Sequence, residues 1–455
     1  MRGTRAGARV VVGLTAVLSL GACSSMPFMD RLPVVVTVTP PPPSSAAPTS
    51  PPSAAASDGV PVGTPTSEGL ATPFVSGARD WTEVAKQVSP AVVRIDVAGC
   101  DTRVVGTGFF IASDLIVTAG HVASGASAIS VQYAGGVTPA LVVGIDRTTD
   151  TALLRTDEPV APATLKLATA GPGVGAAVGI LGYPNGTFNL HATEAGVVGP
   201  GSVDYGSIKV EKALRTDASI TDGVTGGPVV DPYGALVGLV TGSPLWVSGA
   251  DLTIAEKKAK SAALKTAAGG SSGDQSGATD RGARVTSTGF VVPVDQVAAG
   301  VNRWREGPNR DLLSCYGDQI PVIDDPFALK VEVASGHAFA RDVAGALALH
   351  GQAINTGAYE VAYEIFTPRL QQQVEGLYAW RTAQAGAHWD RIEIRSMIGS
   401  GNVVEAKVAL RTTQDKARGV DGQTCSIWEQ SYTMRTSGGG WLIDRVRDLA
   451  PPSAC

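Results

Sequence analysis

The 455-residue sequence has few aromatic side chains, few charged side chains and only five histidines. No cluster of metal-ligating residues and no phosphate-binding loop stands out, so we expect neither a metal site nor a cofactor. The 36 Lys and Arg residues form no basic cluster and are outnumbered by 41 Asp and Glu, which gives no reason to expect a nucleic-acid partner. The 55 glycines and 44% hydrophobic residues suit strands, turns and sizeable cores, and the length indicates at least two domains.

The N-terminus carries an export signal. An arginine-containing start (residues 1–9) precedes the apolar run Val10–Leu20, about a dozen residues where a bilayer span needs roughly 20. The run ends Leu20-Gly21-Ala22-Cys23, which resembles the lipobox of bacterial lipoproteins. This resemblance implies a signal peptide at residues 1–22 and lipid on Cys23. A secretory signal with an incidental cysteine is the alternative, and either interpretation places the mature chain outside the cytoplasmic membrane. The first anchors it to the bacterial cell membrane.

Residues 23–80 are predicted to be a tether. From Pro40 onward this stretch is mostly Pro, Ser, Thr, Ala and Gly, and such a composition cannot bury enough apolar surface to fold. At about 3.1 Å per residue in polyproline-like conformation, it could hold a domain on the order of 100 Å from the membrane.

The region 81–310 is predicted to be an all-β domain. A short entry helix at Trp81–Gln87 precedes β-type runs that alternate with Gly, Pro, Asn and Asp turns. The expected strands are Val92–Val97, Gly108–Ile111, Leu115–Val117, Ile129–Tyr133, Leu141–Ile145, Ala177–Leu181, Ile208–Lys212, Val229–Val230 and Leu236–Val240. Many short strands without a long helical pattern favour antiparallel sandwiches or barrels. A closing helix is expected to run to about Arg305, with Asp295 as its N-cap.

Three separated motifs occur in one order within this region. Thr118-Ala119-Gly120-His121-Val122 comes first, Asp146–Leu154 around Asp150 follows, and Thr216–Pro228 with Thr225 before Gly-Gly-Pro comes last. They resemble the histidine, aspartate and nucleophile segments of trypsin-like serine peptidases, and Ser287–Val294 resembles the last strand of the HtrA-like subgroup. The resemblance covers about half the chain. It implies two six-stranded Greek-key barrels.

The resemblance also implies roles for individual residues. Peptide hydrolysis needs a nucleophile, a base and a group that holds the base in one tautomer. His121 would be the base and Asp150 the orienting group, and the N–H groups of Gly223 and Thr225 would form the oxyanion hole. Taken singly, each residue has a structural interpretation: a structural histidine, a turn cap or a common Gly-Gly-Pro turn. Their order along the chain favours the functional one.

Thr225 departs from the family, which has serine at the nucleophile position. The extra methyl restricts χ1, and a misplacement of about 1 Å can cost a hundredfold in rate. We therefore expect a pseudopeptidase or weakly active homologue that binds extracytoplasmic polypeptides. The alternative is an active endopeptidase that uses Thr225, His121 and Asp150 in cell-envelope protein processing or quality control. The sequence leaves the oligomeric state open.

The family resemblance also locates a specificity pocket. Ser219, six residues before Thr225, would form the floor, with Thr241, Gly242 and Ser243 in the wall. An uncharged floor favours small or aliphatic side chains over Lys or Arg. Residues 250–283 form an insertion that we expect to be a disordered surface loop, with a lid as the alternative.

A smaller α+β domain is predicted at residues 327–455, after a linker at 311–326. Helical patterns at Ala338–Asn355, Gly357–Phe366 and Leu370–Ala385 precede four strand-like runs. Helices followed by a curved meander resemble the NTF2-like cone. Tyr359, Tyr363, Trp380 and Trp389 are expected to be core side chains rather than a ligand-binding box.

After Cys23, four cysteines remain, and an even number suits two disulfides in an oxidising compartment. A hairpin with its tip at residues 437–440 sets Cys425 opposite residue 452 or so, which predicts a Cys425–Cys455 bridge. Cys100 and Cys315 remain for each other.

Overall fold

The computed structural model describes residues 80–204, 208–242, 289–310, 312–313, 315, 329–437 and 440–455. The expected signal peptide, the lipidation site at Cys23, the tether, Ser243, the 250–283 insertion and most of the 311–326 linker lie outside these residues. Among the residues described, no helix has both the length and the hydropathy needed to cross a membrane.

Six antiparallel strands close a first barrel after helix α1 (Trp81–Val88), whose first turn is capped by the Asp80 side chain. The strands are β1 (Val92–Ala98), β2 (Arg103–Phe110), β3 (Leu115–Ala119), β4 (Ala128–Tyr133), β5 (Gly136–Asp146) and β6 (Thr151–Thr156). Their order is β1-β2-β3-β6-β5-β4, with β4 returning beside β1. This return beside the first strand is the Greek-key arrangement.

A second barrel repeats the same topology. Its strands are β7 (Ala177–Gly182), β8 (His191–Asp204), β9 (Lys209–Thr216), β10 (Pro228–Val230), β11 (Leu236–Gly242) and β12 (Gly289–Pro293), in the order β10-β11-β12-β9-β8-β7. The double six-stranded barrel predicted from the sequence is therefore confirmed. Helix α4 (Val294–Trp304) closes the region, but Asp295 lies in its first turn and Pro293 holds the N-cap position. The predicted Asp295 cap is wrong.

The two barrels share an apolar cluster, and each also has a buried cluster of its own. Phe109 of β2 and Leu153 of β6 lie in the same buried cluster as Leu181, Leu236 and Val292 of the second barrel. Burial of apolar side chains contributes about 25 cal/mol per Å², so separating the barrels would expose a large part of this core. The two barrels are thus held as one structural unit.

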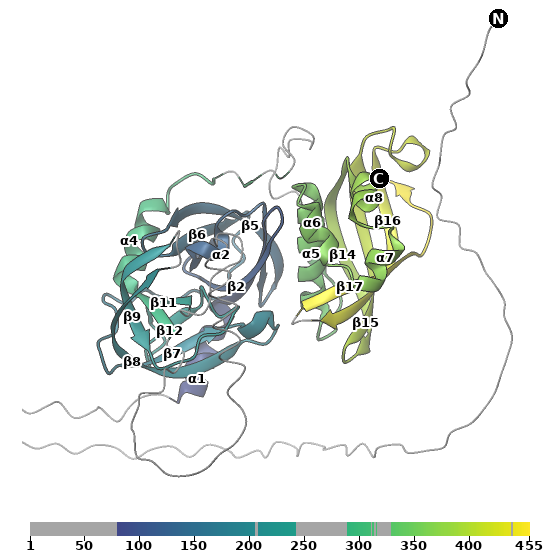
Figure 1. Ribbon diagram of the computed structural model, residues 1–455. Helices are drawn as coiled ribbons and strands as arrows, with labels where there is room; N and C mark the ends of the chain where they lie inside the picture. Colours follow the sequence, from purple (N-terminus) through teal and green to yellow (C-terminus); the bar gives the residue numbers. More distant parts are fainter. Residues whose placement is uncertain are drawn as a thin grey trace, which may run out of the picture. The chain divides into compact units, whose positions relative to one another are not determined.

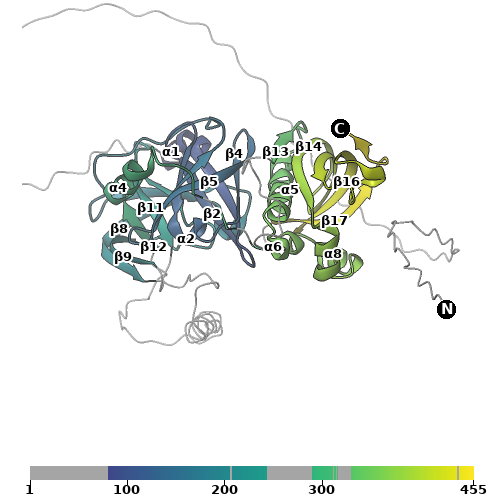
Figure 2. The same ribbon diagram turned by 90° about the horizontal axis from the view of Figure 1, so that it is seen from above.

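The C-terminal residues form an α+β domain (Figures 1 and 2). Helices α5 (Ala340–Asn355), α6 (Tyr359–Glu364), α7 (Pro368–Gln373) and α8 (Leu377–Gln384) accompany β14 (Ala387–Ser400), β15 (Val403–Gln414), β16 (Cys425–Ser437) and β17 (Gly440–Asp448). Two short strands missed by the sequence interpretation complete the sheet: β13 (Lys330–Val333), parallel to β14, and β18 (Ser453–Ala454), beside β16. Helix α5 packs along the buried face of β14. Membership of the NTF2-like class stays a prediction.

The single helix predicted at Leu370–Ala385 is wrong. Two helices, α7 and α8, occupy this stretch, and the chain turns between them where Glu375 and Gly376 both take positive φ values of 59° and 89°. Helix α6 ends at Glu364, and Pro368 begins α7 at a position where its missing N–H is tolerated.

Both predicted disulfides are present. Cys100 and Cys315 lie 5.2 Å apart at their Cα atoms, and Cys425 and Cys455 lie 5.5 Å apart. The first bridge links the β1–β2 turn to the segment between the two domains, and the second fastens the C-terminus to β16.

The aromatic side chains of the C-terminal domain belong to its core, as expected. Tyr359, Trp380 and Trp389 are buried, and Tyr363 packs against the same cluster. His350 lies among these rings at 5.8 Å from Trp380 and 5.3 Å from Trp389, and burial lowers its pKa to about 4. A neutral histidine in this environment is a packing residue.

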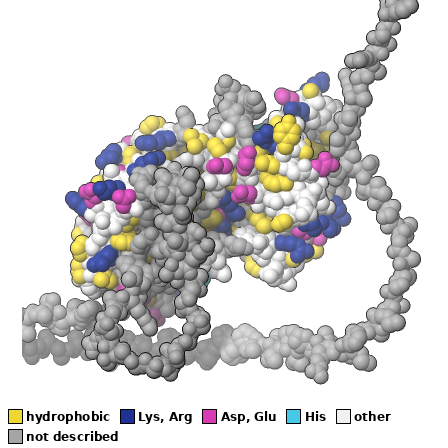
Figure 3. All heavy atoms as spheres, in the orientation of Figure 1, with side chains coloured by type: hydrophobic (Ala, Val, Ile, Leu, Met, Phe, Trp, Pro, Cys, Tyr) yellow, Lys and Arg dark blue, Asp and Glu magenta, His cyan; other side chains and the backbone are white. Residues whose placement is uncertain are grey.

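On the face shown in Figure 3, positive and negative side chains of the described residues are interspersed. Typical pairs are Arg395 with Glu429 at 2.7 Å and Lys86 with Glu83 at 2.8 Å. Exposed pairs of this kind contribute about 0–1 kcal/mol each. The buried cores and the buried polar contacts therefore determine the fold.

Asn355 tests the packing of α5 on the sheet. This residue is 6% exposed, and its side-chain amide accepts from the Trp389 N–H at 2.7 Å and donates to the Trp389 carbonyl at 2.8 Å. Asn355→Asp replaces the donor with an acceptor beside that carbonyl, so we expect the free energy of unfolding to fall by about 2 kcal/mol or more. Asn402→Asp, in the exposed β14–β15 turn, should change it by less than about 0.5 kcal/mol. Urea unfolding followed by tryptophan fluorescence measures both, and equal losses would contradict the assigned role of Asn355.

Candidate active site

The two barrels bring the three predicted catalytic positions to their junction. His121 lies on the short helix α2 (Gly120–Ala123) directly after β3, and Asp150 lies in the turn between β5 and β6. Thr225 lies in the turn between β9 and β10 of the second barrel. His121 directly follows a barrel strand and Asp150 lies in a short turn, so rigid sheet sets their positions. Thr225 lies in the longer connection 217–227.

Asp150 and His121 form a tight pair. The His121 Nδ1 atom lies 3.0 Å and 2.9 Å from the two Asp150 carboxylate oxygens, and the His121 backbone N–H donates to Oδ1 at 2.9 Å. A hydrogen on Nδ1 makes Nε2 the nitrogen that can accept a proton. Asp150 is fully buried and has φ = 46°, a left-handed value that is uncommon outside glycine. The hydrogen bonds between His121 and Asp150 stabilise this conformation of Asp150.

Thr241 adds a third side chain to the His121–Asp150 pair. This contact was not predicted from the sequence. The Thr241 hydroxyl, on β11 of the second barrel, donates to Asp150 Oδ2. A buried carboxylate requires such donors. Thr241 was predicted as a wall of the specificity pocket, but its side chain is fully buried against Asp150. The signal that would identify it is tertiary, because 91 residues separate the two in sequence.

Thr107 organises the loop that carries Thr225. The Thr107 N–H donates to the Thr225 carbonyl at 2.9 Å, and its hydroxyl donates to the Gly223 carbonyl at 2.6 Å. The same hydroxyl oxygen accepts from the Tyr183 N–H at 3.0 Å. Thr107 is fully buried on β2. Its hydrogen bonds to Gly223, Thr225 and Tyr183 therefore join the first barrel to the second at the candidate site. This residue was also missed from the sequence.

One hydrogen bond orients the backbone at Gly223, the residue predicted to contribute to the oxyanion hole. The Asp222 carbonyl accepts a hydrogen bond from the Asn185 N–H. Because the carbonyl and N–H of a trans peptide point in opposite directions, the Gly223 N–H is directed away from Asn185. Neither this N–H nor that of Thr225 donates a hydrogen bond to another residue in the described ranges. Two such amides, two residues apart, can bind a developing negative charge.

Thr225 itself is almost completely enclosed. Only 1% of its surface is exposed, whereas the side chain of His121 is 10% exposed. A nucleophile must meet a substrate carbonyl, and at this position the surrounding atoms leave little access. The site therefore combines an ordered His–Asp pair with an enclosed threonine.

The other residues predicted to form the specificity pocket are Ser219, Gly242 and Ser243. Ser219 is exposed, whereas the floor of an enclosed pocket would be buried. Gly242, with φ = 117°, ends β11, and Ser243 lies outside the described residues. The pocket assignment stays a prediction.

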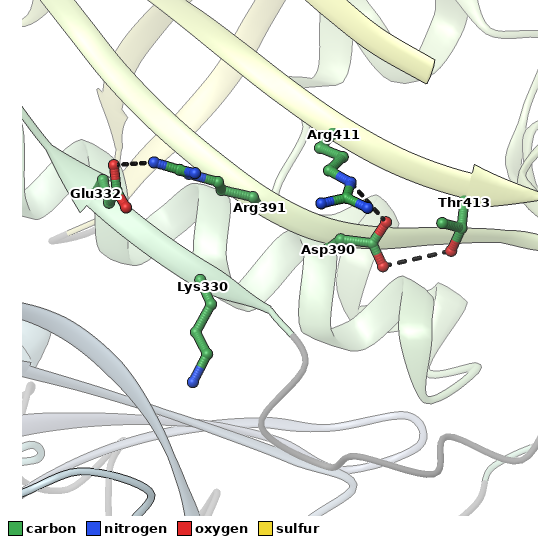
Figure 4. Close-up of a pocket in the computed structure, with 6 residues that line it drawn as sticks. All are labelled: Lys330, Glu332, Asp390, Arg391, Arg411 and Thr413. Atoms are coloured by element: carbon green, nitrogen blue, oxygen red, sulfur yellow. Dashed lines mark hydrogen bonds and ion pairs between the residues drawn. The ribbon is translucent and has the colours of Figure 1, made fainter. Parts of the chain in front are cut away.

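The C-terminal domain has a separate polar hollow of about 350 Å³ (Figure 4). It is lined by Lys330, Glu332, Asp390, Arg391, Arg411 and Thr413. Its charges are paired among themselves, as Glu332 is with Arg391, and Lys330 reaches Asp157 at 2.8 Å. This hollow is a surface ion-pair network. Within the part of the chain that the structure describes, no group of three or more His, Cys, Asp or Glu residues is arranged to hold a metal ion.

Comparison with known proteins finds similarity within the two-barrel region. Residues 106–239 match the family model of the trypsin-like peptidase domain. The serine protease Rv3671c of Mycobacterium tuberculosis (strain H37Rv) is 30% identical over 170 residues, which cover 36% of this chain and 42% of that protein. A Rhizobium meliloti protein named "Probable periplasmic serine endoprotease DegP-like" is 35% identical over 143 residues, covering 30% of this chain and 28% of that protein. Residues 106–239 are thus similar to the trypsin-like peptidase domain, and this part of the chain is similar to serine endoproteases.

These similarities are partial. The chain spans only 28% to 42% of the length of these curated relatives. The crystal structure of the active form of the Rv3671c protease is 24% identical, with a TM-score of 0.39, and the match covers 56% of this chain and 99% of that one. The strand order, rather than this structural match, establishes the fold.

Gly223 provides a test of the loop geometry. It has φ = 88°, and a Cβ added there would lie 2.2 Å from the Tyr183 carbonyl oxygen. Gly223→Ala should therefore cost about 1 kcal/mol for the left-handed backbone and a further 1–3 kcal/mol for the overlap. Gly125→Ala is the matched control, because Gly125 has φ = 73° with nothing within 4 Å of an added Cβ. Thermal unfolding measures both, and a Gly223→Ala loss no larger than that of the control would contradict the close approach.

Proposed function

We propose that residues 81–310 are a trypsin-like serine-peptidase homologue that binds extracytoplasmic polypeptides and hydrolyses them weakly or not at all. The observation that carries this proposal is the enclosed threonine at position 225, where serine would be the nucleophile. The His121–Asp150 pair supports a retained polypeptide-binding site, as do the Gly223 and Thr225 amides, which have no hydrogen-bond partner among the described residues. The export signal and the lipobox-like Cys23 support anchoring at the cell membrane, outside the cytoplasm.

The physical argument concerns one methyl group. Thr225 needs its hydroxyl near His121 and its methyl elsewhere, yet β-branching leaves few χ1 choices. The loop cannot shift to make room, because Thr107 fixes the carbonyls of both Thr225 and Gly223. His121 is equally fixed by Asp150. A displacement of about 1 Å between nucleophile and base is enough to lower the rate about a hundredfold.

The second candidate function is an active endopeptidase that uses Thr225 as nucleophile. The intact His121–Asp150–Thr241 arrangement favours it, because an orienting network of this kind serves to stabilise a protonated histidine during proton transfer. A threonine hydroxyl is a competent nucleophile when a base is adjacent.

Turnover of a fluorogenic peptide library by the purified chain tests the two candidates. Thr225→Ser removes the methyl and keeps the hydroxyl, so we expect it to raise turnover about a hundredfold over the native chain. The added His121→Ala substitution should abolish that gain. Thr221→Ser, in the exposed part of the same loop, is the matched control and should leave turnover unchanged. Native turnover equal to that of Thr225→Ser, and lost in His121→Ala, would establish the active endopeptidase instead.

Polypeptide binding is tested separately with Thr225→Ala, which cannot act as a nucleophile. We expect this variant to bind a reduced, unfolded polypeptide with the same affinity as the native chain, because the amides and the loop backbone are unchanged. Gly223→Ala should weaken binding, since it displaces the loop at Tyr183. Fluorescence anisotropy measures the affinities. No binding by the native chain would remove the proposed polypeptide-binding role.

A further inference from the structure

One outer face of the first barrel has the side-chain pattern of a surface in water. Arg94 and Asp96 of β1 alternate with Val93, Ile95 and Val97, which lie in the interior cluster of that barrel. Because successive side chains of a strand point to opposite faces, both charged residues point outward. A strand with one apolar and one polar face is typical of an antiparallel sheet that has one side in water.

Strand β4 continues this polar face. Ser130 lies opposite Asp96, and Gln132 lies opposite Arg94, in the register between the two strands. The intervening Val131 belongs to the interior cluster of the barrel, so Ser130 and Gln132 point outward. All four polar residues are nevertheless at most 8% exposed. The C-terminal domain covers them.

Helix α5 provides this cover. Arg341 Nη1 donates to the Ala134 carbonyl at 2.9 Å, and a Cβ added at Gly345 would lie 1.9 Å from the side-chain nitrogen of Gln132. Gln352 follows Gly345 by seven residues, about two helical turns, and therefore lies on the same face of the helix. It is 6% exposed. The covering face is thus partly polar, as the covered face is.

Six polar atoms of this contact are buried and have no hydrogen-bond partner among the described residues. They are Nε and Nη1 of Arg94, Nε of Arg103, Oγ of Ser130, and Nε2 and Oε1 of Gln352. Each has less than 1 Å² of accessible surface, so water does not reach it while the domains are in contact. A buried polar group without a partner loses its hydrogen bonds to water and gains none in return. The contact therefore has a cost that separation of the domains removes.

The apolar part of the contact is small, and its packing is incomplete. The buried barrel residues that join the apolar cluster of the C-terminal domain are Ala98, Ala128 and Val137. A cavity of about 130 Å³ remains beside Arg94, and Arg341 of α5 is among the residues that line it. Domains of one chain are expected to move relative to each other unless a large, hydrophobic interface joins them. This interface is neither large in apolar residues nor closely packed.

We propose that the C-terminal domain docks reversibly on the first barrel: α5 separates from β1 and β4, water reaches the six polar atoms, and the contact closes again. The Cys100–Cys315 bridge holds the segment before the C-terminal domain to the barrel, so closure is intramolecular and has a high effective concentration. Helix α5 stays on its own sheet in both states, since Asn355 bonds to Trp389. The candidate catalytic residues lie outside this contact, and the proposal does not depend on their activity.

Thiol labelling of Ser130→Cys in the full chain tests the opening of the contact. Ser130 is fully buried and points toward α5, so a cysteine at this position reacts with a chromogenic thiol reagent only when the domains separate. Val131→Cys is the matched control, because its side chain points into the barrel and only unfolding of the barrel exposes it. We expect Ser130→Cys to react about tenfold or more faster than Val131→Cys, and about tenfold or more slowly than the same variant in denaturant. The native chain is the blank.

Gln352→Leu measures the effect of one unpartnered amide. Combined with Ser130→Cys, it places an apolar side chain of similar size in the closed contact, so labelling should slow about tenfold. Gln372→Leu, at an exposed position of the same domain, is the control and should leave the labelling rate unchanged. If Ser130→Cys fails to fold by circular dichroism, Gln132→Cys on the same outer face replaces it.

Three results would overturn the proposal. Equal labelling rates of Ser130→Cys and Val131→Cys would mean that the contact opens only when the barrel unfolds. A Ser130→Cys rate equal to that in denaturant would mean that the domains do not dock. Labelling that Gln352→Leu leaves unchanged would mean that the buried amide does not oppose docking.

Discussion

The buried carboxylate of Asp150 is the constraint on which the candidate site depends. It accepts hydrogen bonds from His121 of the first barrel and from Thr241 of the second. A fully buried charge needs these donors, so the two barrels must meet in the one arrangement that supplies them. The shared apolar core provides most of the driving force for closing the barrels, but it is not directional. The polar contacts at Asp150, together with those of Thr107, fix the register of that closure.

This rigidity has two consequences for Thr225. Thr107 donates hydrogen bonds to the carbonyls of Gly223 and Thr225, and Asp150 holds the His121 imidazole. In a site with serine such fixation pre-organises the attack, since no energy is lost to reorganisation during reaction. With threonine the same fixation prevents the loop from adapting to the added methyl. The fixed positions of the loop and of His121 therefore increase the effect of replacing serine by threonine at position 225.

The sequence predicted those features whose signal is local. Most of the barrel strands were predicted from short apolar runs, although β6 and β8 were not among them. His121, Asp150 and Thr225 lie in short motifs, and the two disulfides follow from hairpin geometry and the number of cysteines. Thr107 and Thr241 could not be assigned, because each acts on a partner at least 90 residues away. The break between α7 and α8 was overlooked although Gly376 marked it. The cavity at Arg94 had no sequence signal, since its walls come from two domains.

The contact between the first barrel and the C-terminal domain contains apolar residues, which stabilise it, and buried charged residues, which weaken it. Ala98, Ala128 and Val137 of the barrel join the apolar cluster of the C-terminal domain, but Arg94 and its buried polar neighbours lie nearby. A buried charge with unsatisfied donors weakens an interface that apolar residues would make stronger. The Cys100–Cys315 bridge compensates, because a cross-link between residues 215 positions apart restricts the unfolded chain whatever the composition of the interface. The bridge fastens the segment between the two domains to the first barrel, and so shortens the free chain that connects the barrel to the C-terminal domain.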